Sequence, residues 1–486
     1  MKKIFLFLKI IIGLYLILLI PLPQKEQKIL KASEVPFTWN QDELWEKLEL
    51  SFNLAKSIPS RKLDSMVEKM AVEMENLLLA LEAKITHPED SLYGLIENKF
   101  FHITPLISAQ EKKTNSYIQF YNRVRGKIKL DSRNWDMRSL SARNTSYRLL
   151  YGMRAATEEI LLQSSDVDFV STLFVTEEES VTPWANVLGI KVRSGDLLVS
   201  RGGAEVSAFI SRGNDYPGNF SHVAMIHVDK ETNTPYFVEA HIEKGVAIAT
   251  MEQYLNDKKL RFMVMRPRAD LIQMTENPML PYEASSYIFN ESQTRHIPYD
   301  FKMDYYDSSA MFCSEVGSYA YKQFGVKLWE FESTISSNGI VRWLNAFGVQ
   351  NFVTQMPSDL EYDPMLSVVA EWRNKEILFK DHLDNAVMDA LIGLANSGEK
   401  LDYNIWTLPI ARIVKAYSLV LNTIGKEGII PNGMSATMAL KNNDFVARFK
   451  NCKSITKSKV EAFKEENEYL PPYWQLVKMA EESLKK

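Results

Sequence analysis

The stretch Ser221-His222-Val223-Ala224-Met225-Ile226-His227-Val228 is an apolar run with a histidine near its start, and a second run, YFVEAH, occupies residues 236–241. Residues 230–234 have the composition of a turn, so the two runs predict an antiparallel β-hairpin. Because side chains alternate along a strand, Glu239 and His241 share a face, and depending on the register either can lie beside His222. The hairpin thus supplies a histidine and a group able to fix the orientation of its ring.

This hairpin belongs to a longer series of short apolar runs, separated by Gly, Asn, Asp and Pro, that begins after Val181. The connections after His222 are too short for repeated crossover helices, which favours an α+β fold with an antiparallel sheet over a parallel α/β fold. We expect short helices near Ala204 and Met251, and strands at residues 196–200, 222–228, 236–241, 246–249 and 261–265.

A cysteine stands where a helix is expected to begin. The pattern predicts a helix from Cys313 to about Phe324, ended by Gly325. The positive end of a helix dipole favours thiolate over thiol, and a nearby imidazole would stabilise that ion further. The first helical turn also offers backbone N–H groups that can hold an oxyanion. Cys313 is therefore a candidate nucleophile and His222 its candidate base; the alternative is a cysteine that only packs in the core.

Composition and missing motifs exclude several other functions. Lys plus Arg number 57 against 61 Asp plus Glu in 486 residues, which gives no broad positive field for nucleic acid. Cys313 and Cys452 are the two cysteines, too few for a cysteine zinc finger or a disulfide scaffold. The sequence has no phosphate-binding Gly-Lys-Ser loop, no His-Glu-x-x-His motif and no Gly-x-Ser-x-Gly elbow. We therefore expect no cofactor and no metal.

The N-terminal segment is typical of export. Lys2 and Lys3 precede an apolar stretch, residues 4–22, that only Lys9 interrupts. This is a signal sequence or an uncleaved membrane anchor with the lysines inside the cytoplasm. The expected location is the cell envelope, with the bulk of the chain outside the cytoplasm and a membrane contact through this segment. Helical periodicity elsewhere completes the predicted division: residues 1–23 as signal or anchor, 33–180 helical, 181–373 the central domain and 374–486 a helical extension.

Taken together, several short blocks resemble a known family. They are Gly195-Asp196-Leu197-Leu198, Ser221–Ile226, Phe237–Ala240 with Gly245-Val246, Pro298-Tyr299-Asp300-Phe301 and Phe312-Cys313-Ser314-Glu315. In this order they are similar to the circularly permuted NlpC-type papain-like amidases, the YiiX/YaeF-like group. Ordinary members of the wider superfamily have cysteine before histidine, whereas the permuted group has histidine first, as here.

The resemblance implies a role for each of these residues. Cys313 would be the nucleophile, His222 the general base and then acid, and Glu239 the orienting residue, while Asp196 and Tyr299 recur in the pattern as substrate-binding candidates. The implied reaction is hydrolysis of a peptide or amide through an acyl thioester, with a cell-wall peptide as the first substrate class. The alternatives are a lipid acyltransferase or thioesterase of the same superfamily, acting on an acyl lipid, and a non-catalytic envelope scaffold.

Overall fold

A computed structural model describes residues 2–20, 32, 34–110, 113–165, 169–257 and 259–485 of the chain. Its centre is a seven-stranded sheet in the order β1-β11-β8-β4-β5-β6-β7, in which every neighbouring pair is antiparallel. The strands are β1 (Thr172–Phe174), β4 (Leu197–Gly202), β5 (His222–Val228), β6 (Pro235–His241), β7 (Gly245–Thr250), β8 (Lys259–Pro267) and β11 (Leu366–Arg373). The predicted α+β class with an antiparallel sheet is confirmed.

The two faces of the sheet are covered differently. On one face, Leu197, Val223 and Met225 pack against α11 (Leu280–Thr294) and α12 (Cys313–Lys322). On the other, Leu198, Ala224 and Ile226 pack with a small hairpin, β2 (Trp184–Val187) and β3 (Ile190–Arg193). The remaining short elements of this domain are α8 (Glu205–Arg212), α9 (Met251–Asn256), α10 (Ile272–Glu276), β9 (Ser333–Thr334), α13 (Asn338–Ala346), β10 (Val353–Thr354) and η3 (Pro357–Tyr362).

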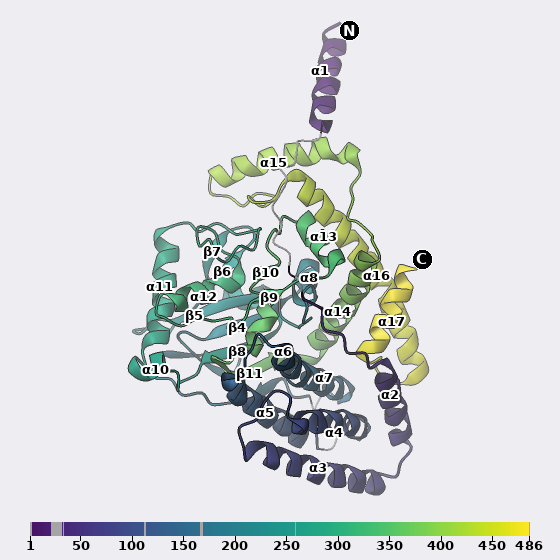
Figure 1. Ribbon diagram of the computed structural model, residues 1–486. Coiled ribbons are helices and arrows are strands. Elements are labelled where there is room, and N and C mark those ends of the chain that lie inside the picture. The colour runs from purple at the N-terminus through teal and green to yellow at the C-terminus, as the bar shows by residue number, and fades with distance from the viewer. Residues whose placement is uncertain are drawn as a thin grey trace.

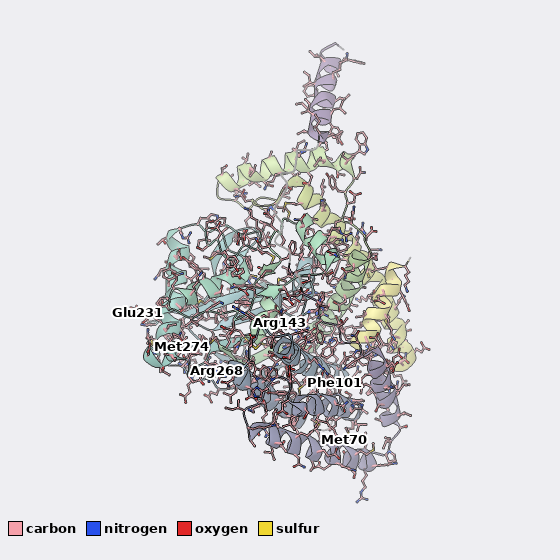
Figure 2. The ribbon with its side chains drawn as sticks, viewed as in Figure 1. Met70, Phe101, Arg143, Glu231, Arg268 and Met274 are labelled. Atoms are coloured by element: carbon pink, nitrogen blue, oxygen red, sulfur yellow. The ribbon has the colours of Figure 1, made fainter. Side chains whose placement is uncertain are left out.

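The N-terminal helices form a layer below the sheet in Figure 1. They are α2 (Asp42–Lys56), α3 (Ser60–Glu82), α4 (Ser91–Ser108), α5 (Thr114–Asp131), η1 (Ser132–Asn134), α6 (Leu140–Tyr147), the π-helical turn η2 (Arg148–Gly152) and α7 (Met153–Gln163). Phe101 and Met70 belong to this layer, which has its own core, and Arg143 lies between the Tyr216 and Phe331 rings, where the layer meets the central domain (Figure 2).

The C-terminal helices cover the side of the molecule opposite α11 (Figure 1). They are α14 (Lys375–Asn396), η4 (Ile405–Thr407), α15 (Leu408–Thr423), α16 (Ala436–Asn467) and α17 (Tyr473–Leu484). α14 is central to this group because it contacts α16 and α17 on one side and α7 and β8 on the other. The two ends of the chain therefore pack against each other as well as against the central domain.

A buried network of arginines and carboxylates joins all three regions. Arg261 of β8 binds Glu158 of α7 (Nη2 to Oε2, 2.8 Å) and Asp381 of α14 (Nε to Oδ2, 2.9 Å). Its other members are equally buried: Arg125, Arg154, Arg201, Arg373, Glu361 and Glu371. Each helical flank thus supplies countercharges to arginines of the sheet.

Several elements differ from the expectation. β11 and β1 extend the sheet beyond the five predicted strands. β1 lies within the range expected to be helical and was missed because a three-residue strand carries too little periodicity to be recognised. Within the range 33–180 that was expected to be helical, the π-helical turn Arg148–Gly152 lies between α6 and α7.

The N-terminal apolar segment forms α1 (Lys2–Leu19), which projects from the body (Figure 1). Within the described residues, none of the helices combines the length and the apolar composition needed to cross a bilayer. α1 has 18 residues, and Lys2, Lys3 and Lys9 are among them. The membrane-crossing helix predicted for residues 4–22 is therefore not supported, and residues 21 and 22 of that prediction lie outside the described part of the chain.

The buried network makes a prediction about stability. Asp381→Asn keeps the shape of the side chain but removes the carboxylate that lies 3.2 Å from Arg201 Nε and 2.9 Å from Arg261 Nε. Because a buried charge is left without its partner, we expect the free energy of unfolding to fall by about 3–5 kcal/mol in chemical denaturation. As a control, Glu75→Gln breaks an exposed pair with Arg123 and should cost less than about 1 kcal/mol. Equal small losses in the two variants would contradict the assignment.

Candidate active site

Cys313 is the first residue of α12, and its position is fixed from both sides. Upstream, a bridge between Tyr299 and Met311 holds the incoming chain, with the Met311 N–H donating to the Pro298 carbonyl (2.9 Å). Downstream, the Glu315 carboxylate accepts a hydrogen bond from the Phe312 backbone N–H (2.8 Å) and closes the first turn. The sulfur consequently lies at the positive end of the helix dipole, where a thiolate is favoured.

Close packing of α12 on the sheet brings Cys313 to the start of β5. A Cβ added at Gly317 would lie 2.7 Å from Leu197 Cδ2 of β4, so a larger residue here would have to displace the buried Leu197 side chain. β4 in turn pairs with β5, with Ser200 opposite His222. The Cys313 sulfur lies 3.9 Å from the Ser221 carbonyl oxygen, and the next residue, His222, is close enough to lower the pKa of the thiol. Cysteine and histidine, which are distant in the sequence, thus meet at one strand end.

Glu239 is the residue that contacts the far side of the histidine ring. Its Oε2 lies 2.5 Å from His222 Nε2, and its Oε1 lies 3.0 Å from His241 Nε2. Since Nε2 of His222 is engaged by Glu239, Nδ1 is the nitrogen left for the sulfur. The sequence left open whether Glu239 or His241 lies beside His222; in the structure Glu239 does, and His241 binds the other oxygen of the same carboxylate.

Lys259 completes the surroundings of Glu239 and was not identified from the sequence. Its Nζ lies 4.0 Å from Glu239 Oε2, 2.9 Å from Asp257 and 4.4 Å from the centre of the Tyr254 ring. Lys259 begins β8, which is separated from β6 by two strands, β4 and β5, in the sheet order, and no local pattern connects those two positions. Only the sheet topology could have shown its proximity.

The electrostatics of this group favour an ion pair. Burial raises the pKa of the Cys313 thiol, but its hydrogen bond to His222 and the charge of that ring outweigh burial and lower it. Burial lowers the pKa of His222, whereas its hydrogen bonds to Cys313 and Glu239 raise it to about 9. Burial raises the pKa of Glu239, but the hydrogen bonds from His222 and His241 outweigh this effect and hold the pKa well below its ordinary value. The lowered thiol pKa and the raised imidazole pKa both shift this pair towards thiolate and imidazolium.

Glu315 is close to the sulfur and remains uncharged at neutral pH. Burial, together with the negative charges of Asp300, Asp304 and Cys313, raises its pKa to about 9 against the opposing effect of the Phe312 N–H. An ionised carboxylate here would repel the thiolate at the same helix end. The protonated carboxyl closes the helix turn without that repulsion.

The two candidate substrate-binding residues are placed differently. Tyr299 is half-buried and packs edge-on against Phe301, with the ring centroids 5.1 Å apart. Burial raises the pKa of the Tyr299 hydroxyl, and the negative charge of the nearby Cys313 sulfur raises it further. Asp196 is not brought to the sulfur. It is buried at the other end of β4 from Ser200, where both carboxylate oxygens lie 2.8 Å from Arg266.

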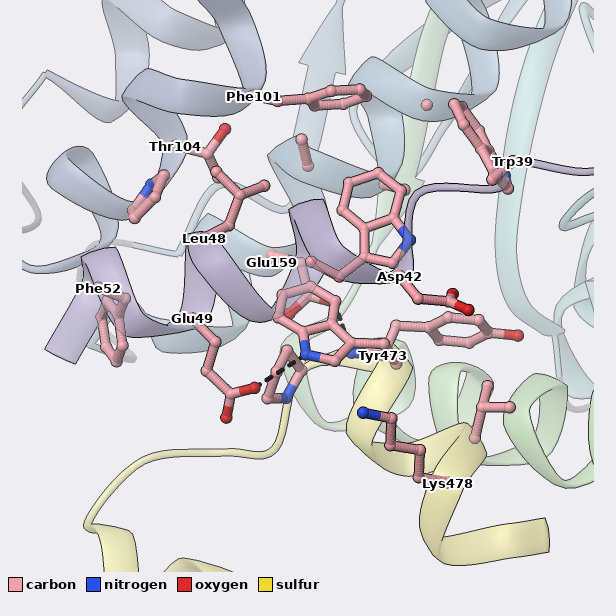
Figure 3. Close-up of a pocket in the computed structure, with 18 of the residues that line it drawn as sticks. Trp39, Asp42, Leu48, Glu49, Phe52, Phe101, Thr104, Glu159, Tyr473 and Lys478 are labelled. Carbon is pink, nitrogen blue, oxygen red and sulfur yellow. Dashed lines mark hydrogen bonds between the residues drawn. The ribbon is translucent and has the colours of Figure 1, made fainter. Parts of the chain in front are cut away.

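A cavity of about 530 Å³ lies elsewhere, between the N-terminal helices and α17 (Figure 3). Trp39, Phe101 and Tyr473 contribute to its walls, and the Trp474 indole N–H donates to Glu49 (2.9 Å) beside it. Cys313, His222 and Glu239 are not among the residues that line it. This chamber belongs to the contact between the two ends of the chain.

An antiparallel sheet packed against a helix that begins at a cysteine, with a histidine on a neighbouring strand, is the papain-like class of fold. Residues 191–370 match the model of the family described as permuted papain-like amidase enzyme, YaeF/YiiX, C92 family. This part of the chain is a circularly permuted papain-like domain of that amidase family, as the resemblance predicted. No curated protein and no solved structure matches the chain significantly.

The ion pair predicts how Cys313 reacts with an alkylating reagent. In a Cys452→Ala background, iodoacetamide should modify Cys313 rapidly at pH 7, and His222→Ala should slow the reaction about tenfold for each unit by which the thiol pKa rises. His227→Ala on the same strand is the matched control, because His227 stacks on Phe289 and has no contact with the sulfur. Identical pH profiles of alkylation in both variants would show that His222 does not activate the thiol.

Glu315 predicts a pH dependence of stability. Its pKa in the folded chain is about 9, above that of an unfolded glutamate, so the folded state keeps a proton that the unfolded state loses. Its contribution is full below the unfolded pKa and is lost as the pH rises through the folded pKa, by up to about 1.4 kcal/mol per pH unit. Glu315→Gln should therefore gain stability relative to the parent between pH 5 and 9. Denaturation curves showing a pH-independent difference would contradict this.

Proposed function

We propose that this chain is a cysteine hydrolase that cleaves amide bonds through an acyl thioester. One observation carries the proposal: the His222 ring lowers the pKa of the Cys313 thiol at the start of α12, while its Nε2 lies 2.5 Å from the Glu239 carboxylate. Covalent acyl transfer requires a nucleophile, a group beside it that carries the proton, and a carboxylate that orients this second group.

The geometry supports the following steps. The thiolate attacks the substrate carbonyl carbon, and the backbone N–H groups of the first turn of α12 stabilise the oxyanion. The imidazolium of His222 gives its proton to the departing amine as the C–N bond breaks, leaving a thioester on Cys313. His222 then removes a proton from water, the resulting hydroxide attacks the thioester, and the thiolate leaves with the acid released. Glu239 holds the ring so that Nδ1 faces the sulfur throughout.

The substrate class follows from the family and from the N-terminal segment. The family model names amidases, so a peptide or related amide is the proposed substrate. The basic and apolar composition of residues 2–20 supports a position outside the cytoplasm, where the proposed substrate is a peptide of the cell wall. The amide substrate and the position outside the cytoplasm are separate proposals, and different experiments test them.

A second candidate function is hydrolysis or transfer of a lipid acyl group. One observation favours it: the segment that follows α15, a helix with exposed apolar side chains, contacts loops bordering the site. Phe301 packs against the backbone of Gly433, where a Cβ would lie 2.4 Å from its ring, and Lys244 binds Glu427 (3.0 Å). The same thioester chemistry would serve an ester or amide within a lipid.

Turnover by variants tests the proposal. Wall-peptide fragments and dispersed acyl lipids are incubated separately with the parent chain, Cys313→Ala and Cys452→Ala, and new amines, acids and esters are measured by mass spectrometry. Cys313→Ala should lose turnover by about 10⁴-fold, whereas Cys452→Ala, whose thiol is buried in α16, should retain it. Turnover that persists in Cys313→Ala would remove Cys313 from the mechanism, and cysteine-dependent turnover of lipids alone would replace the first substrate class by the second.

A further inference from the structure

α15 presents a continuous row of apolar side chains to solvent. The row consists of Ile410, Ile413, Tyr417, Val420 and Ile424, which are each 54–62 % exposed and recur every three or four residues along one side of the helix. The opposite side is attached to the body: Lys415 Nζ donates to the carbonyls of Pro431 and Asn432, and Ser418 Oγ accepts from the Ile430 N–H. The exposed row is therefore held outward by contacts on the inner face.

α1 extends this apolar row out of the molecule. It stands away from the body with its lower end against α15, which runs across it (Figure 1). Tyr15 donates its hydroxyl hydrogen to the Trp406 carbonyl, and Arg412 Nη1 donates to the Leu18 (2.6 Å) and Ile20 (2.9 Å) carbonyls. The two helices thus form one surface, the α1/α15 face, defined by the exposed apolar residues of α1 and of residues 405–424.

From this face we infer that the chain binds the surface of a lipid bilayer, with α15 lying in the interface and the apolar side chains of α1 entering the hydrocarbon. Successive residues Ile4, Phe5, Leu6 and Phe7 are each 62–70 % exposed, so over this turn α1 presents apolar side chains in every direction, and Lys9 follows them. A protein groove would cover only one side of α1, whereas lipid can surround the helix, so exposure on several sides favours lipid as the partner. The half-exposed Trp406 and Tyr417 are aromatic residues of the kind that gather at membrane interfaces.

Charge around α15 fits an anionic surface. Residues 404–435 contain a single acid, Glu427, which is paired with Lys244. Of the three cations, Arg412 and Lys415 bind backbone carbonyls, and Lys426 is exposed. α15 itself has no acidic residue. A helix with an apolar outer face, aromatic residues and a positive flank is the composition that lies in the interface of anionic membranes.

Binding through this face would hold the candidate active site near lipid. Residues 427 and 433, which follow α15, contact Lys244 in the β6–β7 turn and Phe301 in the loop that carries Tyr299. The first loop follows β6, which ends at His241, and the second contains Tyr299, which bridges Met311 two residues before Cys313. The membrane proposal itself does not depend on catalysis by Cys313, because its test measures only lipid contact.

A fluorescent probe tests the orientation of α15. In the full chain carrying Cys313→Ser and Cys452→Ala, an environment-sensitive nitrobenzoxadiazole label is attached at Val420→Cys or, as a control of similar exposure on α3, at Val72→Cys. Vesicles of phosphatidylglycerol and phosphatidylcholine should raise emission several-fold at position 420 and leave position 72 unchanged. No rise at position 420, or equal rises at both, would overturn the inference. A rise that depends on protein concentration without vesicles would show that a second copy covers the face and would also overturn it.

A pair of charge substitutions tests the contribution of α15 to lipid binding while α1 is left unchanged. Ile413→Glu with Val420→Glu places two charges on the exposed row, and Val72→Glu with Leu79→Glu places two at the same spacing on the exposed side of α3. In vesicle flotation, the α15 variant should bind at least about tenfold more weakly than the α3 variant, because two apolar side chains no longer leave water. Circular dichroism checks that both are folded. Equal flotation of the two variants would show that α15 does not lie on the bilayer.

Discussion

The buried pairing of arginines with carboxylates is the constraint on which the architecture depends. Arg201 and Arg261 lie in the middle of the central sheet, and their countercharges, Asp381 and Glu158, come from helices after and before the papain-like domain. Both acids lie outside residues 191–370, the part that matches the family model. Without the flanks these arginines would be buried charges with no partner, a cost of several kcal/mol each. The flanks are therefore part of how this sheet is stabilised.

The same network fixes the strands that carry the candidate site. Arg201 follows Ser200, which pairs with His222, and Arg261 follows Lys259, which lies beside Glu239. Countercharges from α7 and α14 therefore hold β4 and β8 at the positions from which His222 and Glu239 are supported. The geometry around Cys313 is in this sense set by the whole chain, although its chemical groups come from one domain.

Local patterns were sufficient to predict the elements that carry the chemistry. The alternation in residues 222–241 predicted β5 and β6, and the spacing after Cys313 predicted α12, because each depends on contacts between near neighbours. The partner of His222 could not be decided in the same way, since Glu239 and His241 share a strand face and only the packed geometry separates them. The buried arginines were missed because charged residues ordinarily indicate surface. Asp196, conspicuous in the family pattern, forms an ion pair with Arg266 away from the sulfur.

Opposite charges are paired throughout the candidate site. Lys259 keeps its charge because, although burial lowers its pKa, Tyr254, Glu239 and Asp257 raise it overall. Lys259 lies 2.9 Å from Asp257 and 4.0 Å from Glu239, and His222 lies between Glu239 and the Cys313 thiol, whose pKa it lowers. An ionised Glu315 would add a further negative charge in a buried place, and its raised pKa shows that the proton is retained instead. Paired charges of this kind can be buried at modest cost and favour the ionised form of the sulfur, which is the condition for a reactive cysteine inside a folded chain.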